Sequence, residues 1–411
     1  MGSDLADKAR IPSDDELRQI TTRAVADIIP RGEFVAALKS GRALRLKMGF
    51  DPSAPDLTLG HAVGLRKLRR LQDLGHTIVV IVGDWTARIG DPSGQSKTRP
   101  MLTADEVRVN AETYLRQFSK IVDRELTEVR WQSEWFDEFT LTTIVSLAAK
   151  FTVAQMLERE DFATRFAAKK PIGIHELFYP LLQAYDSVAV QADVEFGGTD
   201  QTFNLLVGRE LQPEFGQRPQ SVFTVPLLVG TDGVKMSKSQ GNYIALNDAP
   251  HDMYGKVMSI TDPLVGDYFE LLTDVPDKEI AGVREAVKKG GAGARDAKMR
   301  LAREIVSQFH GAPPADAAEV EFRRVFSRGE TPEEASELPL AFNGAVTVEV
   351  DLTEALVNAG LAESKSEVRR LLTQGAVESD GQRVAGPRVR VREDTVIRVG
   401  KHRFVRVVDA G

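Results

Sequence analysis

The most informative absence in this sequence of 411 residues is cysteine, which does not occur at all. Without cysteine the chain can form no disulfide bond, no thiolate zinc site and no iron–sulfur cluster, and it has no cysteine nucleophile. The six histidines are scattered and include no His-x-x-x-His pair, so the usual helical zinc motif is also missing. Any catalysis must therefore use other side chains.

Long apolar runs are lacking as well. No stretch approaches the roughly 18 unbroken apolar residues that span a bilayer, and residues 1–16 are of mixed charge without an apolar core. We therefore expect no membrane helix and no secretory signal, and a cytoplasmic location. Hydrophobic residues make up 42% and charged residues 27%, as in globular proteins, and the length predicts two or three domains.

The charge of the chain is unevenly distributed. The formal net charge of −7 argues against a general binder of polyanions. Residues 365–406, in contrast, carry 11 Lys and Arg but only 5 Asp and Glu. A solvated charged surface and a surface that binds nucleic acid both fit this local excess, and charge alone does not separate them.

The first third of the chain has the pattern of a βαβ unit. Residues 43–50 read as a strand, residues 60–75 as an amphipathic helix, and residues 77–82 (TIVVIV) as a strand buried on both faces. Such units build doubly wound parallel sheets, whose ligands bind beside the carboxyl ends of the strands. We therefore predict an α/β fold with a Rossmann-like doubly wound parallel sheet.

Three further regions follow from the same patterns. A helical insertion is predicted at about 104–190, with amphipathic stretches at 105–121, 140–159 and 174–188. Pro313 and Pro314 should end the longest helix of a later helical region. The predicted domains are an α/β domain with its insertion (1–242), an α-helical domain (243–328), a linker (329–344) and a small α+β domain (345–411).

Two short clusters suggest phosphate chemistry. TLGH (58–61) stands where a loop enters a helix, and a helix start offers free N–H groups and a positive dipole end to a polyphosphate. KMSKS (235–239) carries two lysines three residues apart, suited to charge that develops on a leaving pyrophosphate. The structural alternatives are a capping or packing histidine and a solvated basic loop.

A third cluster suggests recognition of an amino acid. Tyr179, Gln183 and Asp186 are spaced by four and three residues, so they share one helix face over about 10 Å. A polar surface stripe is the structural alternative. Asp91 and Asp200, which stand beside glycines at apparent loop ends, favour the binding site.

These motifs together resemble a known family. KMSKS after a degenerate HIGH-like tetrapeptide resembles the class I aminoacyl-tRNA synthetases. Longer strings are similar to bacterial tyrosyl-tRNA synthetases, in order along nearly the whole chain: MGFDPSAPDLTLGH (48–61), GDWTARIGDPSG (83–94), YPLLQAYDS (179–187) and GGTDQ (197–201). LTEALVNAGLAESKSEVRRLLTQGAV (352–377) is similar to the small αL RNA-binding domain at the end of these enzymes.

The resemblance implies a tyrosine–tRNA ligase with tyrosine, ATP and tRNA(Tyr) as substrates. It implies that 1–242 is a catalytic nucleotide-binding domain, 243–328 an anticodon-binding domain and 345–411 an RNA-binding domain. It also implies a homodimer, with Mg²⁺ held mainly by the phosphates rather than by a protein metal site. It implies that Asp91, Tyr179 and Gln183 hold the tyrosine ammonium, that Asp186 accepts from the phenol hydroxyl, and that Gln201 lies at the amino-acid end. Catalysis would fall to Thr58, His61, Lys235 and Lys238.

The remaining implied contacts concern ATP and tRNA. The residues implied along ATP are Gly49, Asp51, Ser53, Gly60, His61, Gly198, Asp200, Leu227, Leu228, Lys235 and Lys238. From the basic region, we assign tRNA binding to Lys365, Arg369, Arg370, Arg388 and Arg390, because the spacing of each group places its cations on a shared surface.

Two positions depart from the family pattern. Thr58 replaces the first histidine of the tetrapeptide, and Lys47 stands where many members have a second tyrosine for the phenol, which leaves that partner unassigned. A tryptophan-specific synthetase and a non-catalytic RNA-binding protein with the same fold remain as alternatives. Amino-acid-dependent exchange between ATP and pyrophosphate separates the three.

Overall fold

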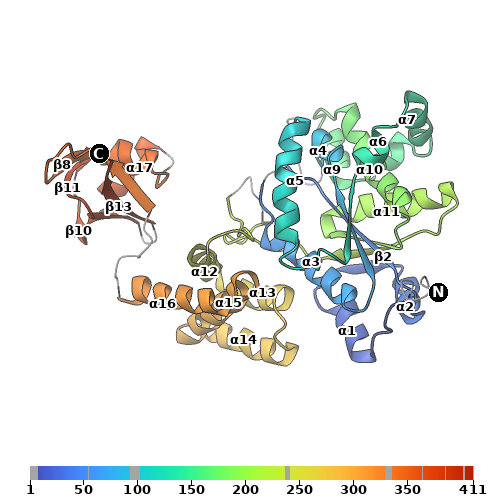
Figure 1. Cartoon of the computed structure of the whole chain (residues 1–411), viewed down its shortest axis with the longest axis horizontal. Coiled ribbons are helices and arrows are strands. Elements are labelled where there is room, and N and C mark those ends of the chain that lie inside the picture. The colour runs from blue at the N-terminus through green and yellow to red at the C-terminus, as the bar shows by residue number, and fades with distance from the viewer. Residues whose placement is uncertain are drawn as a thin grey trace. The chain divides into compact units, whose positions relative to one another are not determined.

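The computed structural model describes residues 8–53, 55–92, 102–236, 241–328, 336–362, 364–384, 386–400 and 403–410. The chain forms two compact units, which divide between residues 315 and 316 (Figure 1). None of the helices within the described residues is long and apolar enough to cross a membrane.

The first unit is built on a sheet whose described part has six strands in the order β1-β6-β5-β2-β3-β4. All neighbours are parallel except β1, which pairs antiparallel with β6. The strands are β1 (Asp27–Ile29), β2 (Arg45–Phe50), β3 (Thr77–Val82), β4 (Thr127–Trp131), β5 (Val194–Gly198) and β6 (Ser221–Val225). The chain leaves β2 for β3 on one side and reaches β5 on the other, so β2 and β5 flank the switch point where such sheets bind ligands.

The predicted βαβ unit is confirmed. It consists of β2, α3 (Leu59–Gln72) and β3, and β3 has the bounds predicted for TIVVIV. Five of its six residues are buried, as a strand in the middle of a parallel sheet requires. The fold class, a doubly wound parallel sheet with helical additions, is therefore confirmed.

The insertion predicted at about 104–190 is mainly helical, as expected, but it also contains one strand that the sequence patterns did not reveal. β4 lies inside this segment and extends the sheet beside β3. Its sequence, TEVRW, is short, alternates charged and apolar residues and is only half-buried at the sheet edge, so it lacks the apolar run that reveals β3. The helices from α4 onward that cover the sheet are α4 (Thr86–Ile89), α5 (Ala104–Phe118), α6 (Ser133–Phe136), α7 (Leu141–Ala148), α8 (Val153–Met156), α9 (Glu160–Ala167), α10 (Ile174–Ala189) and α11 (Thr202–Leu211).

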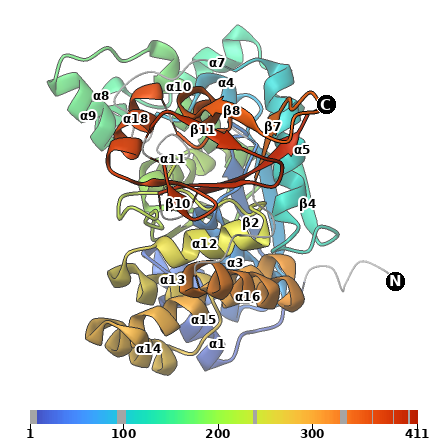
Figure 2. The same cartoon turned by 90° about the vertical axis from the view of Figure 1, so that its left-hand side faces the viewer.

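Two more helices precede β2, and a helical layer follows β6. The first two are α1 (Asp14–Thr22) and α2 (Arg31–Lys39). The layer contains α12 (Pro250–Ser259), α13 (Val265–Leu272), α14 (Asp277–Lys289) and α15 (Ala292–His310). Figures 1 and 2 show these four helices side by side near α3, against which α13 packs. The domain boundaries predicted at residues 242 and 328 stay predictions, since the chain on both sides of residue 242 belongs to one compact unit and the division between the units falls at residues 315 and 316.

The two prolines of the helical region do not end α15. That helix stops at Gly311, whose φ of +87° favours glycine. Pro313 and Pro314 instead lie in the first turn of α16 (Ala312–Arg328), where a missing N–H breaks no hydrogen bond within the helix.

Within its described residues the second unit contains most of α16, followed by two small sheets and the two helices α17 and α18. The larger sheet has the order β10-β9-β12-β13-β7, and β8 pairs with β11. The elements are β7 (Ser336–Leu340), β8 (Val348–Asp351), α17 (Leu352–Asn358), α18 (Lys365–Thr373), β9 (Val377–Ser379), β10 (Gln382–Arg383), β11 (Arg388–Val391), β12 (Val396–Val399) and β13 (Arg403–Asp409). Both helices share one apolar core with the strands, including Leu356, Val368, Ile397 and Val405.

The linker predicted at 329–344 was therefore too long. β7 occupies 336–340 and pairs in parallel with β13, and Leu338 is buried in the core of the second unit. The composition of this acidic, proline-containing stretch concealed the strand because β7 gains its stability from a partner about 70 residues away, not from a local pattern. Residues 329–335 lie outside the described part of the chain.

Candidate active site

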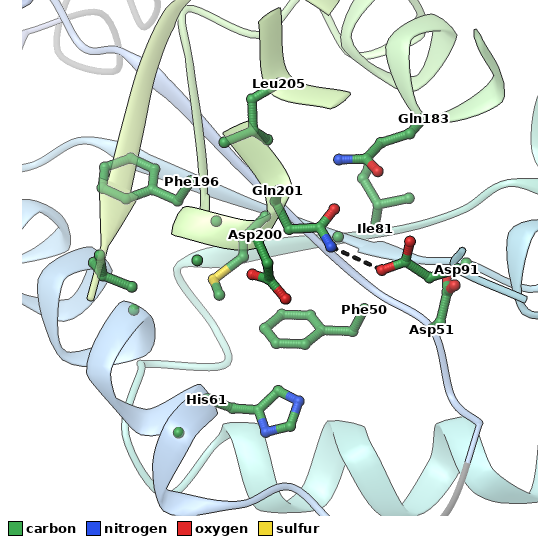
Figure 3. Close-up of a pocket in the computed structure, with 18 of the residues that line it drawn as sticks. Phe50, Asp51, His61, Ile81, Asp91, Gln183, Phe196, Asp200, Gln201 and Leu205 are labelled. Atoms are coloured by element: carbon green, nitrogen blue, oxygen red, sulfur yellow. Dashed lines mark hydrogen bonds between the residues drawn. The ribbon is translucent and has the colours of Figure 1, made fainter. Parts of the chain in front are cut away.

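A cavity of about 310 Å³ lies at the carboxyl ends of the central strands, beside the start of α3. Most of the residues predicted to bind tyrosine or ATP line it. They are Gly49, Asp51, Thr58, Gly60, His61, Asp91, Tyr179, Gln183, Asp186, Gly198, Asp200, Gln201, Leu227, Leu228 and Lys235. In Figure 3, His61 and Gln183 lie at opposite ends of this cavity. The structure thus brings together residues that are up to 186 positions apart.

Two of the predicted residues are not seen in the cavity. Ser53 is exposed and does not belong to its lining. Lys238 lies outside the described residues, as do Ser237 and Ser239 of the same motif. The roles predicted for Ser53 and Lys238 stay predictions.

His61 stands in the first turn of α3 with a defined orientation. Its Nδ1 accepts from the backbone N–H of Thr58 at 3.1 Å and lies 2.9 Å from Thr58 Oγ1. A backbone N–H can only donate, so Nδ1 is an acceptor and the ring proton is on Nε2. His61, which lines the cavity at the start of α3, can therefore act as a hydrogen-bond donor through Nε2.

Lys235 lies at the rim of the cavity, beside Asp200. Its Nζ is 2.8 Å from Asp200 Oδ2, and half of the lysine side chain is exposed. A cation on an exposed side chain can exchange this carboxylate for another anionic group. The short helix that holds Asp200 (Thr199–Gln201) follows β5 directly.

The predicted face of α10 is confirmed, since Tyr179, Gln183 and Asp186 all reach the cavity. The Tyr179 hydroxyl donates to Asp51 Oδ2 at 2.8 Å. Burial, reinforced by the charge of Asp51, raises the pKa of Tyr179 well above its ordinary value, so the phenol keeps its proton.

Asp186 presents an open acceptor in a buried place. Only 1% of the residue is exposed, and its Oδ2 accepts from Gln132 Nε2 at 2.8 Å. Its Oδ1 has no hydrogen-bond partner among the residues that the structure describes. Burial raises the pKa of Asp186 to about 7, against the opposing charge of Lys47. Burying an acceptor oxygen without a hydrogen-bond donor costs free energy, so a ligand that donates a hydrogen bond to this atom would be favoured here.

A chain of amides connects the rest of this half of the cavity. Gln201 Nε2 donates to Asp91 Oδ2 at 2.7 Å, which Figure 3 draws as a dashed line. Asn204 Nδ2 donates both to Gln201 Oε1 at 2.9 Å and to Gln183 Oε1 at 3.1 Å. These bonds fix the orientation of the Gln201, Asn204 and Gln183 amides and link them to the Asp91 carboxylate.

Sequence reasoning missed three residues that shape the site: Gln132, Arg159 and Asn204. Gln132 holds Asp186, and its Oε1 accepts from Thr86 Oγ1 at 2.9 Å. Arg159, which is 4% exposed, pairs with Asp91 at 3.2 Å. None of the three belongs to a recognisable motif. Gln132 directly follows β4, the overlooked strand, so recognising that strand would have been the one available signal.

The cations assigned to tRNA binding are all exposed in the second unit. Lys365, Arg369 and Arg370 lie on α18, and Arg388 and Arg390 on β11. The pKa of the Asp351 carboxyl is lowered, chiefly by hydrogen bonds from Thr353 and also by the charges of Arg388 and Lys365. The first cation of the helix and the first of the strand therefore share the neighbourhood of one carboxylate.

Among the described residues, no group of three His, Asp or Glu side chains could hold a metal ion. Lys47, which stands where many family members have a second tyrosine, is fully buried, and its Nζ lies 2.9 Å from Glu195 Oε1.

Comparisons with known proteins agree with this site. Residues 39–327 match the family described as tRNA synthetases class I (W and Y), and residues 352–397 match the S4 domain. A tyrosine–tRNA ligase of Dehalococcoides mccartyi is 55% identical over 96% of this chain and 99% of its own length. One of Thermotoga maritima is 52% identical over 96% of this chain and 97% of its own length.

Solved structures support the fold at lower identity. A tyrosyl-tRNA synthetase from Archaeoglobus fulgidus, complexed with L-tyrosine, superposes with a TM-score of 0.60 at 22% identity, over 74% of this chain and 99% of that one. A C-terminally truncated mitochondrial enzyme from Aspergillus nidulans gives 0.62 at 21% identity, over 76% and 93%. With the two family matches and relatives above half identity, the chain belongs to the class I tRNA synthetases, and within them to the tyrosine–tRNA ligases.

Proposed function

We propose that the chain activates tyrosine with Mg-ATP to tyrosyl-adenylate and then transfers the tyrosyl group to the 3′-terminal adenosine of tRNA(Tyr). The observation that carries this proposal is the open, buried Oδ1 of Asp186 at the end of a polar cavity. A tyrosine hydroxyl is a donor that fits it. We also place the reaction in the cytoplasm, because its product serves protein synthesis.

Tyrosine would lie along the face of α10. Its hydroxyl donates to Asp186 Oδ1, and its ammonium donates to the oxygens that the amide chain gathers, from Asp91 and Gln183. Tyr179 closes this corner through its bond to Asp51. Seven residues separate Tyr179 from Asp186, a rise of about 10 Å, which suits an extended amino acid.

ATP would occupy the half of the cavity at the start of α3. The adenine lies by the backbone at Leu227 and Leu228, and the ribose by Gly198 and Asp200. His61 Nε2 and the N–H groups near Gly60 meet the phosphates at the positive end of the helix. Gly49 and Asp51 line the path between nucleotide and amino acid.

The first step needs positioning and charge stabilisation rather than a covalent enzyme intermediate. A carboxylate oxygen of tyrosine attacks the α-phosphorus in line, and the bond from that phosphorus to the bridging oxygen of pyrophosphate breaks. Lys235 and Lys238 neutralise the leaving pyrophosphate, with His61, Thr58 and Ser53 as neutral donors. We propose that Mg²⁺ is held mainly by the phosphates, so a chelator should stop adenylate formation without unfolding the protein.

We propose that the second unit binds tRNA through Lys365, Arg369, Arg370, Arg388 and Arg390. Exposed cations on a helix and a neighbouring strand suit contact with a phosphate backbone, whose affinity depends on salt. The S4 match over 352–397 supports this assignment.

We further propose a homodimer. Large apolar side chains along α7 to α10 are more than half exposed, which is unusual for a surface that stays in water: Leu141, Val145, Val153, Phe166 and Ile174. A second copy of the chain offers the same surface and would cover both. Sedimentation equilibrium should find a dimer that Leu141→Asp weakens; a monomer at micromolar concentration would contradict it.

The direct test of the whole reaction is tRNA charging. Purified protein with ATP, Mg²⁺ and tRNA(Tyr) should incorporate labelled tyrosine, and tRNA(Trp) with labelled tryptophan should give none. Charging with tryptophan alone would identify the tryptophan-specific alternative, and no charging at all would leave the non-catalytic RNA-binding protein.

A further inference from the structure

A buried ion pair between Lys47 and Glu195 lies next to the tyrosine half of the cavity, although neither residue lines it. Both side chains are no more than 1% exposed. The two residues are register partners on the parallel strands β2 and β5, so the sheet itself places them side by side. The roles proposed above make no use of this pair.

The pair is saturated with hydrogen bonds. Lys47 Nζ donates to the backbone carbonyl of Gln183 at 2.7 Å and to Ser187 Oγ at 2.8 Å, in addition to Glu195 Oε1 at 2.9 Å. Glu195 Oε2 accepts from Ser187 Oγ at 3.0 Å and from Gln220 Nε2 at 2.5 Å. Buried ion pairs often stabilise a fold no better than apolar side chains of similar volume. The presence of two charges here therefore needs another explanation.

That explanation lies in Gln183. Its Nε2 donates to Glu195 Oε1 at 3.1 Å, and its Oε1 accepts from Asn204 at 3.1 Å. A carboxylate only accepts, so an ionised Glu195 forces the NH₂ end of Gln183 toward the sheet and leaves the oxygen end on the side of Asn204. In Figure 3 this amide points into the space shared with Gln201 and Asp91.

We propose that Lys47 is a positioning residue for tyrosine recognition: its ion pair keeps Glu195 an acceptor, and Glu195 fixes the Gln183 amide in the orientation that the tyrosine ammonium meets. This inference rests on the proposed function, in which Gln183 and Asp186 face tyrosine.

The charge of Lys47 also acts on Asp186, three residues further along α10. After burial, which raises the pKa of Asp186 to about 7, the strongest influence is the Lys47 charge, which lowers it. The hydrogen bond from Gln132 also lowers this pKa, and the Glu195 charge raises it. Loss of the lysine charge thus raises the pKa of Asp186 further, and less of the ionised acceptor remains at neutral pH.

The test is Lys47→Met, which keeps much of the volume and removes the charge. Tyrosine-dependent pyrophosphate exchange is measured from about pH 6 to 9, since kcat/KM reports the free enzyme. We expect kcat/KM for tyrosine to fall by ~10²-fold, with KM for ATP unchanged within about twofold. The acidic limb of the tyrosine profile should move up by about one pH unit.

Lys47→Met alone leaves Glu195 as an unpaired buried charge, which can destabilise the fold. The double variant Lys47→Met with Glu195→Gln removes both charges, so it should recover thermal stability. It should retain the tyrosine defect, because a side-chain amide also donates and no longer dictates how Gln183 points. The upward shift of its acidic limb should be smaller than in Lys47→Met, because the Glu195 charge, which raises the pKa of Asp186, is also removed.

The matched control is another buried ion pair that lies outside the cavity lining. Arg165 on α9 and Glu176 on α10 are each 3% exposed and directly paired. The variant Arg165→Met with Glu176→Gln should alter stability without changing the pH profile for tyrosine.

Unchanged tyrosine kinetics and pH limb in both Lys47 variants, or full recovery of both in the double variant, would show that the pair is only structural and would overturn the inference. A wild-type protein without tyrosine-dependent exchange would instead overturn the proposed function itself, and this inference with it.

Discussion

The cavity of the first unit and the exposed cations of the second unit present opposite kinds of polar group. In the cavity Asp186 is buried, Asp186 and Gln183 have fixed protein partners, and one carboxylate oxygen of Asp186 is left open. On the second unit, Lys365, Arg388 and Arg390 are exposed. Buried groups discriminate by geometry and are little screened by salt, whereas exposed cations give affinity that salt weakens. Selection of the amino acid and binding of the RNA should therefore respond differently to mutation and to ionic strength.

The largest effect should come from Asp186→Asn, which removes the open acceptor of the cavity. A site built around a substrate hydroxyl rejects the analogue without it by ~10⁴–10⁵, a general figure that already includes synthetases of this family. We expect most of that preference for tyrosine over phenylalanine to disappear in pyrophosphate exchange, at any salt concentration, with KM for ATP little changed. Asp193→Asn, an aspartate that pairs with Arg42 outside the cavity, is the control. Wild-type discrimination in Asp186→Asn would refute the assignment.

Lys235→Ala should follow, with a loss of rate rather than of tyrosine binding. A cation that meets charge on the leaving pyrophosphate contributes mainly in the transition state, so adenylate formation should slow by ~10²-fold. Pre-steady-state kinetics measure that rate, and tyrosine binding without ATP is measured separately. Lys256→Ala removes a lysine that pairs with Asp248 away from the cavity and should be silent. Equal losses of rate and tyrosine affinity would mean that this loop is structural.

The basic surface predicts a smaller effect that depends on salt. Arg388→Gln with Arg390→Gln should leave pyrophosphate exchange unchanged and weaken tRNA binding, with a salt slope reduced by about one for each phosphate that the variant no longer binds. The control is Arg398→Gln. Arg398 lies on β12 and forms an ion pair with Glu378 on β9. If tRNA charging and its salt dependence match the wild type in the double variant, tRNA does not bind there.

The mildest change should be Thr58→Ala. The hydroxyl of Thr58 contacts His61 Nδ1, but the backbone N–H of Thr58 holds the same nitrogen and survives the substitution. One neutral hydrogen bond is worth about 1 kcal/mol, so the rate of adenylate formation should fall about fivefold. A loss as large as that of Lys235→Ala would mean that the hydroxyl itself meets the phosphates.

Local periodicity explains which parts of the molecule were predictable. TIVVIV and the Tyr179, Gln183 and Asp186 face each depend on spacing within one element, and both predictions agree with the structure. Gln132 and the Lys47–Glu195 pair depend on contacts between elements distant in sequence, and neighbouring residues carry no sign of them. The strand β7 was not predicted for the same reason, because it pairs with the distant strand β13. Sequence thus predicted the residues that line the cavity better than the residues that hold them in place.

The central claim, that a tyrosine hydroxyl fills the open acceptor of the cavity, is tested most directly by exchange of labelled pyrophosphate into ATP with one amino acid at a time. We predict exchange that depends on tyrosine, with tryptophan and phenylalanine near background, and the same order at low and high salt. Exchange that tryptophan stimulates as well as tyrosine, or no exchange with any amino acid, would contradict the account.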